Sequence, residues 1–219
     1  MSEKLTNLLL VGLMIVSIGL FAHRNYGGAA SNNGGSSVTY RTDWKKIRDT
    51  WGTAEDTTAK VQIIEFADFQ CAACRDFAEV TVPELRKKYD VSLTVVNLPL
   101  SGHEHAPQAA RMFVCAKERA FPLHDVLYAK QDSLGKKPWV EYAIEAGVTD
   151  VPAWEACVAD TTSRVKVEGS KALASKLGIA VTPTILINGW QLTGGSRSIE
   201  SLSATIDATL EGKKPPVPN

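Results

Sequence analysis

The chain has 219 residues, of which 44% are hydrophobic and 22% are charged, the composition of an ordinary globular protein with one principal domain. Its 24 basic and 24 acidic residues cancel to a formal net charge of zero. The sequence therefore lacks the basic excess typical of nucleic-acid-binding domains, and we expect no nucleic-acid partner.

An apolar run from Leu8 to Ala22, preceded by Lys4, dominates the N-terminus. It is short for a membrane-spanning helix, which needs about 20 apolar residues. Two interpretations stay open: an uncleaved membrane anchor over residues 1–24, which we favour, and a signal peptide that is removed within residues 1–30. Both send the rest of the chain to the extracytoplasmic face of the cytoplasmic membrane, in the cell envelope or periplasm.

Residues 25–40 are rich in glycine, serine and asparagine, and are predicted to form a flexible linker. One domain is then expected over residues 41–219. At its start, Trp44, Ile47 and Trp51 recur with helical spacing. This pattern predicts a short helix over residues 43–51 that docks onto the domain through its tryptophans.

The next segments predict a strand, a helix and a second strand. Val61–Phe66 is β-branched and aromatic, Val91–Leu98 is rich in β-branched residues, and Cys71–Tyr89 between them has helical periodicity. We expect this helix to kink at Pro83, which lacks a backbone N–H. A long crossing helix implies that the two strands are parallel, so Cys71 falls at a strand-to-helix turn.

Cys71 and Cys74 form a CxxC pair at that turn. Free N–H groups and the helix dipole favour a thiolate at a helix N-terminus, and cysteines in CxxC motifs have pKa values of about 3.5–7 instead of about 8.5. Cys74 lies on the apolar stripe of the helix and is expected to be less exposed. One attacking and one resolving sulfur is the asymmetry that thiol–disulfide exchange requires.

A zinc site built from these cysteines with His103 and His105 is the rival interpretation. The two histidines are separated by one residue, which is tighter than the usual spacing of zinc-binding histidines. We therefore expect no metal.

Residues 104–177 are predicted to form a helical insert within an α/β frame. Prolines fall where helices can start and glycines where they can stop; these are Pro107, Pro122, Pro138, Pro152, Gly147 and Gly178. The insert also contains the other two cysteines, Cys115 and Cys157.

The C-terminal part predicts a β-hairpin and a closing helix. Thr184–Asn188 and Trp190–Thr193 flank an Asn-Gly turn, and an amphipathic pattern follows over 199–210. Thr182 and Pro183 stand directly before the hairpin. An arbitrary X–Pro bond is cis only about 5% of the time, so the pattern alone does not predict a cis bond.

Together these features resemble the DsbA-like thiol–disulfide oxidoreductases of the thioredoxin superfamily. The resemblance covers roughly Lys60–Leu210 and rests on VQIIEFADFQCAAC, HEHA, QAARMFVCA, FPLHDVLYAKQ, WEACV and GIAVTPTILINGW. It implies an α/β thioredoxin fold with an inserted α-helical domain, and a protein-disulfide oxidoreductase that needs no cofactor.

The resemblance also assigns roles to residues outside the CxxC pair. Pro183 would be cis and face the pair, with Thr182 offering backbone hydrogen bonds to a bound substrate. Glu65 would be the buried acid that moves protons for Cys74, and burial would then raise its pKa. The alternative for Glu65 is a surface carboxylate on an edge strand.

Ala72 and Ala73 depart from the strongly oxidising relatives, which carry Pro and His at these positions. Alanine offers no charge or side-chain donor to the Cys71 thiolate, so we predict a less stabilised thiolate and a less oxidising pair. Cys115 and Cys157 match a region in which some relatives carry a structural disulfide. An even cysteine count and an extracytoplasmic setting favour that bond, and two free, buried cysteines remain the alternative.

The expected partners follow from the same resemblance. We favour an oxidase that acts on exported proteins with cysteines and is recharged by a membrane quinone-linked partner, either DsbB-like or vitamin K epoxide reductase-like. The N-terminal segment would hold the enzyme at the membrane. A reductase or isomerase of the same fold, and a non-catalytic peptide-binding chaperone, stay open as alternatives.

Overall fold

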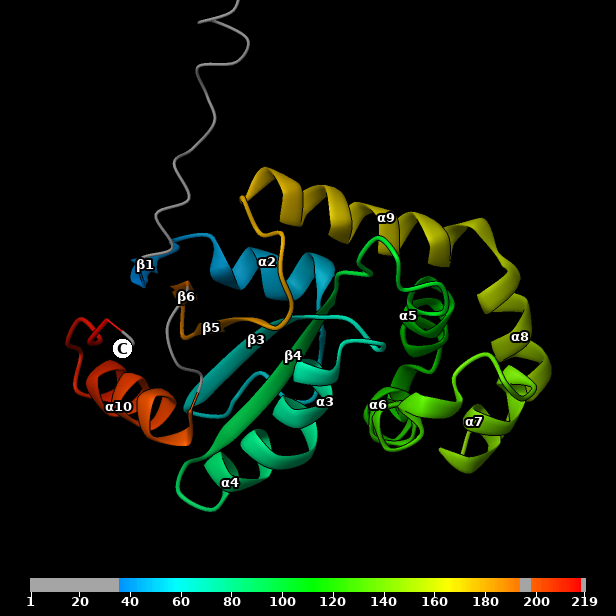
Figure 1. The fold of residues 1–219 in the computed structure, drawn as a ribbon, viewed down its shortest axis with the longest axis horizontal. Coiled ribbons are helices and arrows are strands. Elements are labelled where there is room, and N and C mark those ends of the chain that lie inside the picture. Colours follow the sequence, from blue (N-terminus) through cyan, green and yellow to red (C-terminus); the bar gives the residue numbers. More distant parts are fainter. Residues whose placement is uncertain (1–35, 194–197, 218–219) are drawn as a thin grey trace, which may run out of the picture. The chain divides into compact units, whose positions relative to one another are not determined.

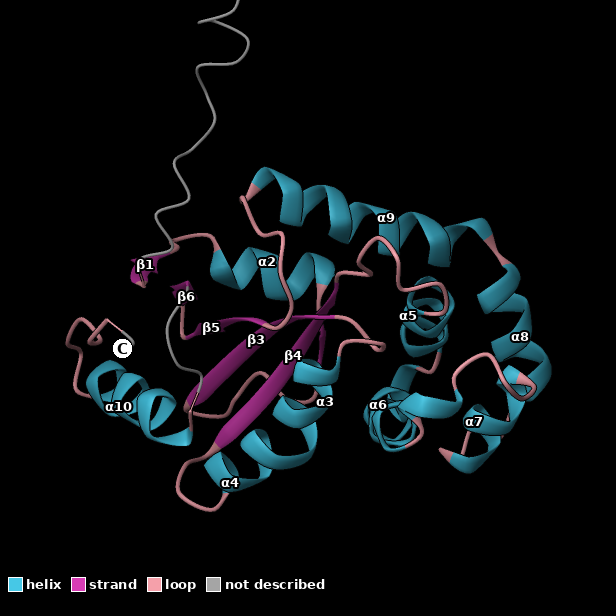
Figure 2. Cartoon of the chain, viewed as in Figure 1, coloured by secondary structure: helices cyan, strands magenta, loops and turns pink. Residues whose placement is uncertain are grey.

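A mixed β-sheet lies at the centre of the computed structural model, which describes residues 36–193 and 198–217 (Figures 1 and 2). Within these residues the sheet has six strands in the order β1-β6-β5-β3-β4-β2. The strands are β1 (Ser37–Tyr40), β2 (Thr53–Ala54), β3 (Val61–Ala67), β4 (Val91–Asn97), β5 (Thr184–Ile187) and β6 (Trp190–Thr193).

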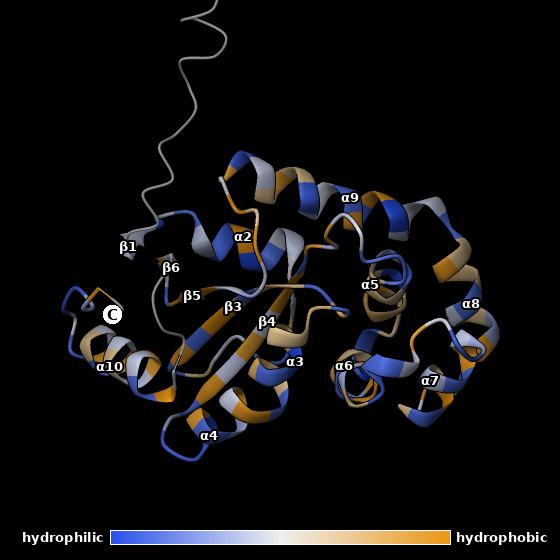
Figure 3. Ribbon diagram, in the orientation of Figure 1, coloured by the Kyte–Doolittle hydropathy of each residue, from blue (hydrophilic) through white to orange (hydrophobic). Residues whose placement is uncertain are grey.

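β3 lies in the middle of this sheet. It pairs in parallel with β4, as predicted, and antiparallel with β5. All seven of its residues are buried, because helices cover both faces of the sheet. In Figure 3, hydrophobic residues colour β5 and parts of β3 and β4 orange, and Ile185, Leu186 and Ile187 are fully buried.

Helices from distant parts of the chain form the two covering layers (Figure 1). One layer contains α2 (Trp44–Trp51) and α9 (Thr161–Lys176), and the other contains α3 (Ala72–Asp76), α4 (Val82–Arg86) and α10 (Ile199–Leu210). Trp44 and Ile47 of α2 are buried in the core, which confirms that this helix docks through its apolar stripe.

The helix after β3 is interrupted, as the proline predicted. Between α3 and α4 the segment Phe77–Thr81 is π-helical, and the N–H of Val82 bonds the carbonyl of Phe77. Pro83 follows directly and has no N–H to donate. Widened turns of this kind and prolines are both recognised causes of irregular helix geometry. The helical segment ends at Arg86, earlier than Tyr89.

Helices fill the segment between β4 and β5, on the right of Figure 1. They are α5 (Ala106–Cys115), α6 (Ala120–Ala129), α7 (Trp139–Glu145), α8 (Val151–Ala159) and α9. Pro107 and Pro152 lie in the first turns of α5 and α8. Gly147 and Gly178 follow helix ends with φ of 80° and 70°, the left-handed conformation that glycine adopts without strain.

The C-terminal hairpin has the predicted turn. Asn188 and Gly189 have φ of 46° and 94°, which is the positive pair that a two-residue type I′ turn requires. α10 spans Ile199–Leu210, as its periodicity predicted.

The predicted linker is wrong at its C-terminal end. Ser37–Tyr40 form β1 and pair with β6 from Thr193 to Trp190. Val38 is buried and Tyr40 stacks on Trp190 with ring centroids 5.0 Å apart, so β-branched and aromatic side chains outweigh the preceding glycine and serine. The short edge strand β2 was not predicted.

The predicted N-terminal anchor, residues 1–24, and residues 25–35 of the linker lie outside the described residues. Among the helices that the structure describes, none combines the length and the apolar character needed to span a bilayer.

Candidate active site

The CxxC pair lies where β3 passes into α3, and buried Asp68 shapes the turn between them. Its Oδ1 accepts the N–H of Gln70 at 2.6 Å. Its Oδ2 accepts the N–H of Leu100 at 2.7 Å and lies 2.8 Å from Nδ1 of His103. The carbonyl of Asp68 also accepts the N–H of Cys71 at 3.0 Å. One carboxylate thus fixes the redox turn, residues 68–71, against the loop after β4.

Cys71 is the N-cap residue of α3, and its thiol is free and half-buried. The Thr182–Pro183 bond is cis, and the thiol donates to the Thr182 carbonyl with 3.4 Å between Sγ and oxygen. The structure therefore brings the distant Thr182–Pro183 segment to the CxxC pair.

The surroundings of Cys71 favour its thiolate. A hydrogen bond from the Cys74 thiol lowers the pKa of Cys71 to about 5, helped by Thr182 and by backbone N–H groups of Ala73 and Cys74. Among the described residues the buried hydroxyl of Thr182 has no hydrogen-bond partner, so it is available to the thiolate. Ala72 is exposed and adds no charge to this set.

Cys74 has the opposite character. It lies one turn into α3, is fully buried and is also a free thiol. Burial raises its pKa, and the neighbouring Cys71 and Glu65 raise it further. The two sulfurs of the pair are therefore an accessible thiolate and a buried thiol.

Glu65 lies under the pair, in the middle of β3. Its register partners are Val95 of β4 and Ile185 of β5, and it has no exposed surface. The alternative of a surface carboxylate on an edge strand is therefore wrong. Burial raises the pKa of Glu65 to about 8, which the nearby Cys74 thiol offsets only in part. Neither carboxyl oxygen has a hydrogen-bond partner within the part of the chain that the structure describes, and the raised pKa keeps the carboxyl mostly protonated at neutral pH.

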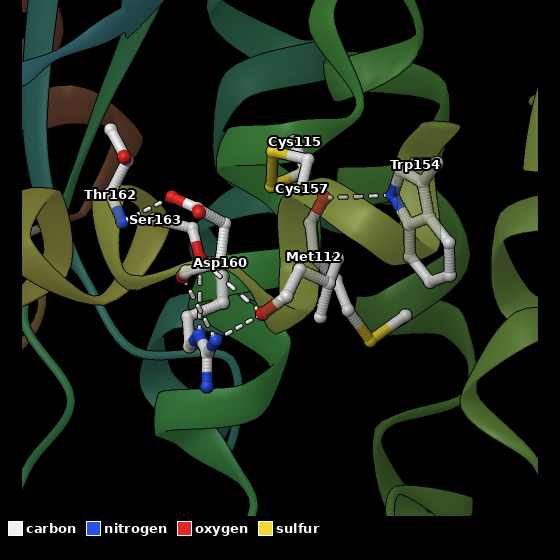
Figure 4. The surroundings of a disulfide bond; sticks show 9 residues. Met112, Cys115, Trp154, Cys157, Asp160, Thr162 and Ser163 are labelled. Carbon is white, nitrogen blue, oxygen red and sulfur yellow. Dashed lines mark hydrogen bonds between the residues drawn. A yellow bond between two sulfur atoms is a disulfide. The ribbon is translucent and has the colours of Figure 1, made fainter. Parts of the chain in front are cut away.

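Cys115 and Cys157 lie in the helical insert and are joined by a disulfide (Figure 4). Their Cα atoms are 5.8 Å apart, and the bond ties the end of α5 to α8 across 42 positions of sequence. Nearby, the indole N–H of Trp154 donates to the carbonyl of Met112 at 3.3 Å. The disulfide and this hydrogen bond both join α5 to α8.

Arg111 joins α5 to the end of α8 and the start of α9. Its guanidinium donates to the carbonyls of Val158 and Asp160 and to the hydroxyl of Ser163. The Asp160 side chain in turn caps α9 by accepting the N–H of Thr162 at 2.6 Å. These contacts hold the insert together away from the CxxC pair.

The histidines of the rival zinc site have other partners. His103 pairs with Asp68, and the ring of His105 lies 6.2 Å from the ring of Trp139. His124, which received no role from its sequence context, is buried among aromatic rings of the insert. Among the described residues no group of three or more acidic, histidine or cysteine side chains could hold a metal.

Several residues of the site were missed from the sequence. Asp68 carries a signal that could have been used, since a polar residue that ends a buried strand just before a functional turn often shapes that turn. Gln70, within the turn, accepts the N–H of Ala106, and Gln131, the last residue of FPLHDVLYAKQ, donates to the carbonyl of Cys71. Their contacts depend on how the insert packs.

A sequence model described as thioredoxin matches residues 54–208, and the chain belongs to the thioredoxin family. The Na⁺/H⁺ antiporter NhaA of Herminiimonas arsenicoxydans is 29% identical over 158 residues, which make up 71% of this chain and 25% of the antiporter. The chain thus spans about a quarter of the length of this relative.

Disulfide bond formation protein D of Bacillus subtilis is 24% identical over 183 residues, covering 71% of this chain and 75% of that protein. The crystal structure of oxidised BdbD from Bacillus subtilis superposes with a TM-score of 0.61 at 23% identity, over 76% of this chain and 95% of that one. The predicted thioredoxin fold and the resemblance to DsbA-like proteins are confirmed.

Proposed function

We propose that this protein is an extracytoplasmic thiol–disulfide oxidoreductase that introduces disulfides into exported proteins through Cys71 and Cys74. The observation that carries the proposal is the opposite character of the two thiols, with the pKa of Cys71 lowered to about 5 and that of buried Cys74 raised. The likeness to a relative named for disulfide bond formation supports it.

In the proposed reaction the enzyme starts with a Cys71–Cys74 disulfide. A substrate thiolate attacks Sγ of Cys71, which is the more accessible sulfur, and the Cys71–Cys74 bond breaks as a mixed disulfide forms. A second substrate thiolate then attacks the substrate sulfur of the mixed disulfide and releases the Cys71 thiolate. The substrate loses two electrons and the cysteine pair gains them.

Glu65 supplies the proton that this reaction needs. Cys74 leaves as a thiolate in a buried site that disfavours its charge. The carboxyl of Glu65, with a pKa raised to about 8 by burial, is protonated at neutral pH and can protonate Cys74. In the reverse step it takes the proton back, as a group with a pKa near the working pH does best.

The substrate is held beside Cys71 by the segment that precedes the hairpin. Thr182 offers its backbone to an extended substrate segment, and Pro183 shapes that backbone. Val181, next to them, is 59% exposed and adds an apolar surface for the substrate. This arrangement suits unfolded chains, which offer extended backbone and free cysteines.

The oxidised state must be restored after each turnover. We assign this step to a membrane quinone-linked partner, DsbB-like or vitamin K epoxide reductase-like, which accepts two electrons from the Cys71–Cys74 dithiol. The N-terminal segment would keep the enzyme at the extracytoplasmic face of the membrane, near this partner.

Trapping tests the proposal. Cys74→Ala removes the resolving sulfur, so mixed disulfides with envelope proteins should accumulate through Cys71 and should dissolve on reduction. The double variant Cys71→Ser/Cys74→Ala is the matched control and should trap nothing. No adducts with Cys74→Ala, together with normal function of Cys71→Ser in cells, would instead indicate a peptide-binding chaperone.

Disulfide reduction or isomerisation by the same pair is the second candidate. The observation that favours it is Ala72-Ala73, which leaves the Cys71 thiolate without a charged or donor side chain from the CxxC dipeptide. A weaker thiolate makes the dithiol less stable and the pair less oxidising.

A further inference from the structure

Gln131 lies in the 3-10 turn Gln131–Ser133, which follows α6 in the insert. Its side-chain amide reaches the redox turn, although it is 60 positions away in sequence from Cys71. Nε2 donates to the carbonyl of Phe69 at 2.9 Å and to that of Cys71 at 3.0 Å. One amide group thus bridges the two carbonyls that flank Gln70.

Gln70 makes the reciprocal contact. Its Oε1 accepts the N–H of Ala106 at 2.9 Å and also that of His105, which are at the N-terminus of α5. These N–H groups have no partner within the helix. The redox turn therefore caps a helix of the insert, while a turn of the insert holds the redox turn.

The carbonyl of Cys71 has hydrogen-bond donors besides the Gln131 amide. It already accepts the N–H groups of Cys74 and Arg75, each at 3.1 Å, as the first turn of α3. The Gln131 amide brings a further partial positive charge to this residue, whose sulfur carries the reactive charge. Partial positive charge near the start of a helix favours an anionic side chain there, even where the donor bonds the backbone and not the sulfur.

We propose that Gln131 is a positioning residue for Cys71: from the helical insert, its amide fixes the redox turn and favours the thiolate over the thiol. The proposal rests on the proposed function of the Cys71–Cys74 pair and adds a role for the insert. In this proposal the helical insert affects the reactivity of the Cys71–Cys74 pair, in addition to packing against the sheet domain.

The test compares three glutamine variants in the full chain. Gln131→Met keeps length and apolar bulk but removes the donor. Gln131→Glu keeps the shape and places a carboxylate, with an ordinary pKa of about 4.3, against two carbonyl oxygens. Gln108→Met is the matched control, because Gln108 is a half-buried glutamine of α5 outside the redox turn.

The main readout is the pH titration of the Cys71 thiolate by its ultraviolet absorbance, in reduced protein. Loss of one hydrogen-bond donor should raise the pKa of Cys71 in Gln131→Met by about half a unit to one unit. The equilibrium with glutathione should shift about three- to tenfold toward the protein disulfide. Gln131→Glu should raise the pKa further, and Gln108→Met should match the wild type.

A merely structural role would lower the melting temperature and leave the Cys71 titration unchanged. A folded Gln131→Met or Gln131→Glu with the wild-type titration overturns the proposal. The titration needs no exchange activity, so the two proposals can fail separately. A wild-type protein that forms no disulfide in glutathione buffers would refute the proposed function, whatever Gln131 does to the thiolate.

Discussion

The two cysteine pairs of this chain share their chemistry but not their surroundings. Cys71 and Cys74 are free thiols at the start of a helix, beside the Thr182 carbonyl and above a buried carboxyl. Cys115 and Cys157 are joined to each other and tie two helices of the insert. The first pair has a free, half-buried sulfur with a stabilised thiolate, whereas the sulfurs of the second are bonded to each other and form no thiolate.

The difference teaches that position decides what a cysteine pair does. A pair that opens and closes needs one sulfur that a thiolate can attack and that leaves easily. A structural disulfide needs only two cysteines on neighbouring helices that lie close enough to bond. Cys115 is 4% exposed, so its sulfur has little surface that a thiol could attack. Changes at each pair should therefore affect different properties of the protein.

The largest effect is expected from Cys71→Ser. Without the attacking sulfur, oxidation of a dithiol peptide should fall to the uncatalysed rate. The melting temperature of the reduced protein should change little, because Cys71 is half-buried and a serine hydroxyl can keep the hydrogen bond to the Thr182 carbonyl. Stopped-flow fluorescence of the peptide measures the oxidation rate. Substantial remaining exchange would mean that another cysteine does the chemistry.

Glu65→Gln should alter stability in a pH-dependent way. The pKa of Glu65 is raised from 4.5 to about 8, so the folded protein binds more protons than the unfolded chain between these values, and stability falls as the pH rises through them. The variant lacks this loss. The free energy of unfolding of the variant, relative to that of the wild type, should therefore increase by about 4–5 kcal/mol between pH 4 and pH 9.

Urea unfolding at both pH values, in reduced protein, measures that difference. Glu65→Gln should also oxidise a dithiol peptide more slowly than the wild type, because the amide cannot protonate Cys74. An unchanged pH dependence would mean that Glu65 has the same pKa in the folded and unfolded protein, and that burial does not keep its carboxyl protonated near neutral pH.

The double variant Cys115→Ala/Cys157→Ala should lower the stability of the protein without changing its exchange activity. Loss of a cross-link over 42 positions lowers the free energy of unfolding by about 4 kcal/mol in the chain-entropy model. Peptide oxidation below the melting temperature should stay near the wild-type rate. If a folded variant exchanged only at the background rate, the Cys115–Cys157 disulfide would also be needed for exchange, and the two pairs would not have separate roles.

Ala73→His should give a smaller shift at the reactive pair. A histidinium near Cys71 favours the thiolate and should lower the pKa of Cys71 by about one unit. The pKa of Cys71 is lowered from 9.0 to about 5 in the folded protein, so the reduced protein loses stability as the pH falls through that range. In the variant, this loss of stability should continue to a lower pH.

The matched control is Ala156→His. It places the same side chain at an exposed position beside Cys157, where no thiolate exists. The Cys71 titration should then equal that of the wild type. An equal shift in both variants would point to a general charge effect and not to the CxxC dipeptide.

Most of the frame was predictable because it depends on local patterns. β-branched runs gave β3 and β4, Asn188-Gly189 gave the hairpin turn, and apolar periodicity gave α10. β1 was missed because its pairing with β6 depends on residues at least 150 positions away. The glycine- and serine-rich segment before it concealed a short β-branched stretch.

The site was predictable at the CxxC pair but not around it. The position of Cys71 at a helix start follows from the chain order of strand and helix. The contacts of Gln131 and of Asp68 join segments that are 60 and 35 positions apart. Such contacts are set by the packing of the insert on the sheet, which no local pattern encodes.

The reduction potential of the Cys71–Cys74 couple, measured in glutathione buffers, tests the account most directly. Thioredoxin has a reactive-cysteine pKa of about 7 and a potential of about −270 mV, and DsbA has about 3.5 and −120 mV. With the pKa of Cys71 at about 5, interpolation predicts about −180 mV. A value near −270 mV or below would contradict an oxidase.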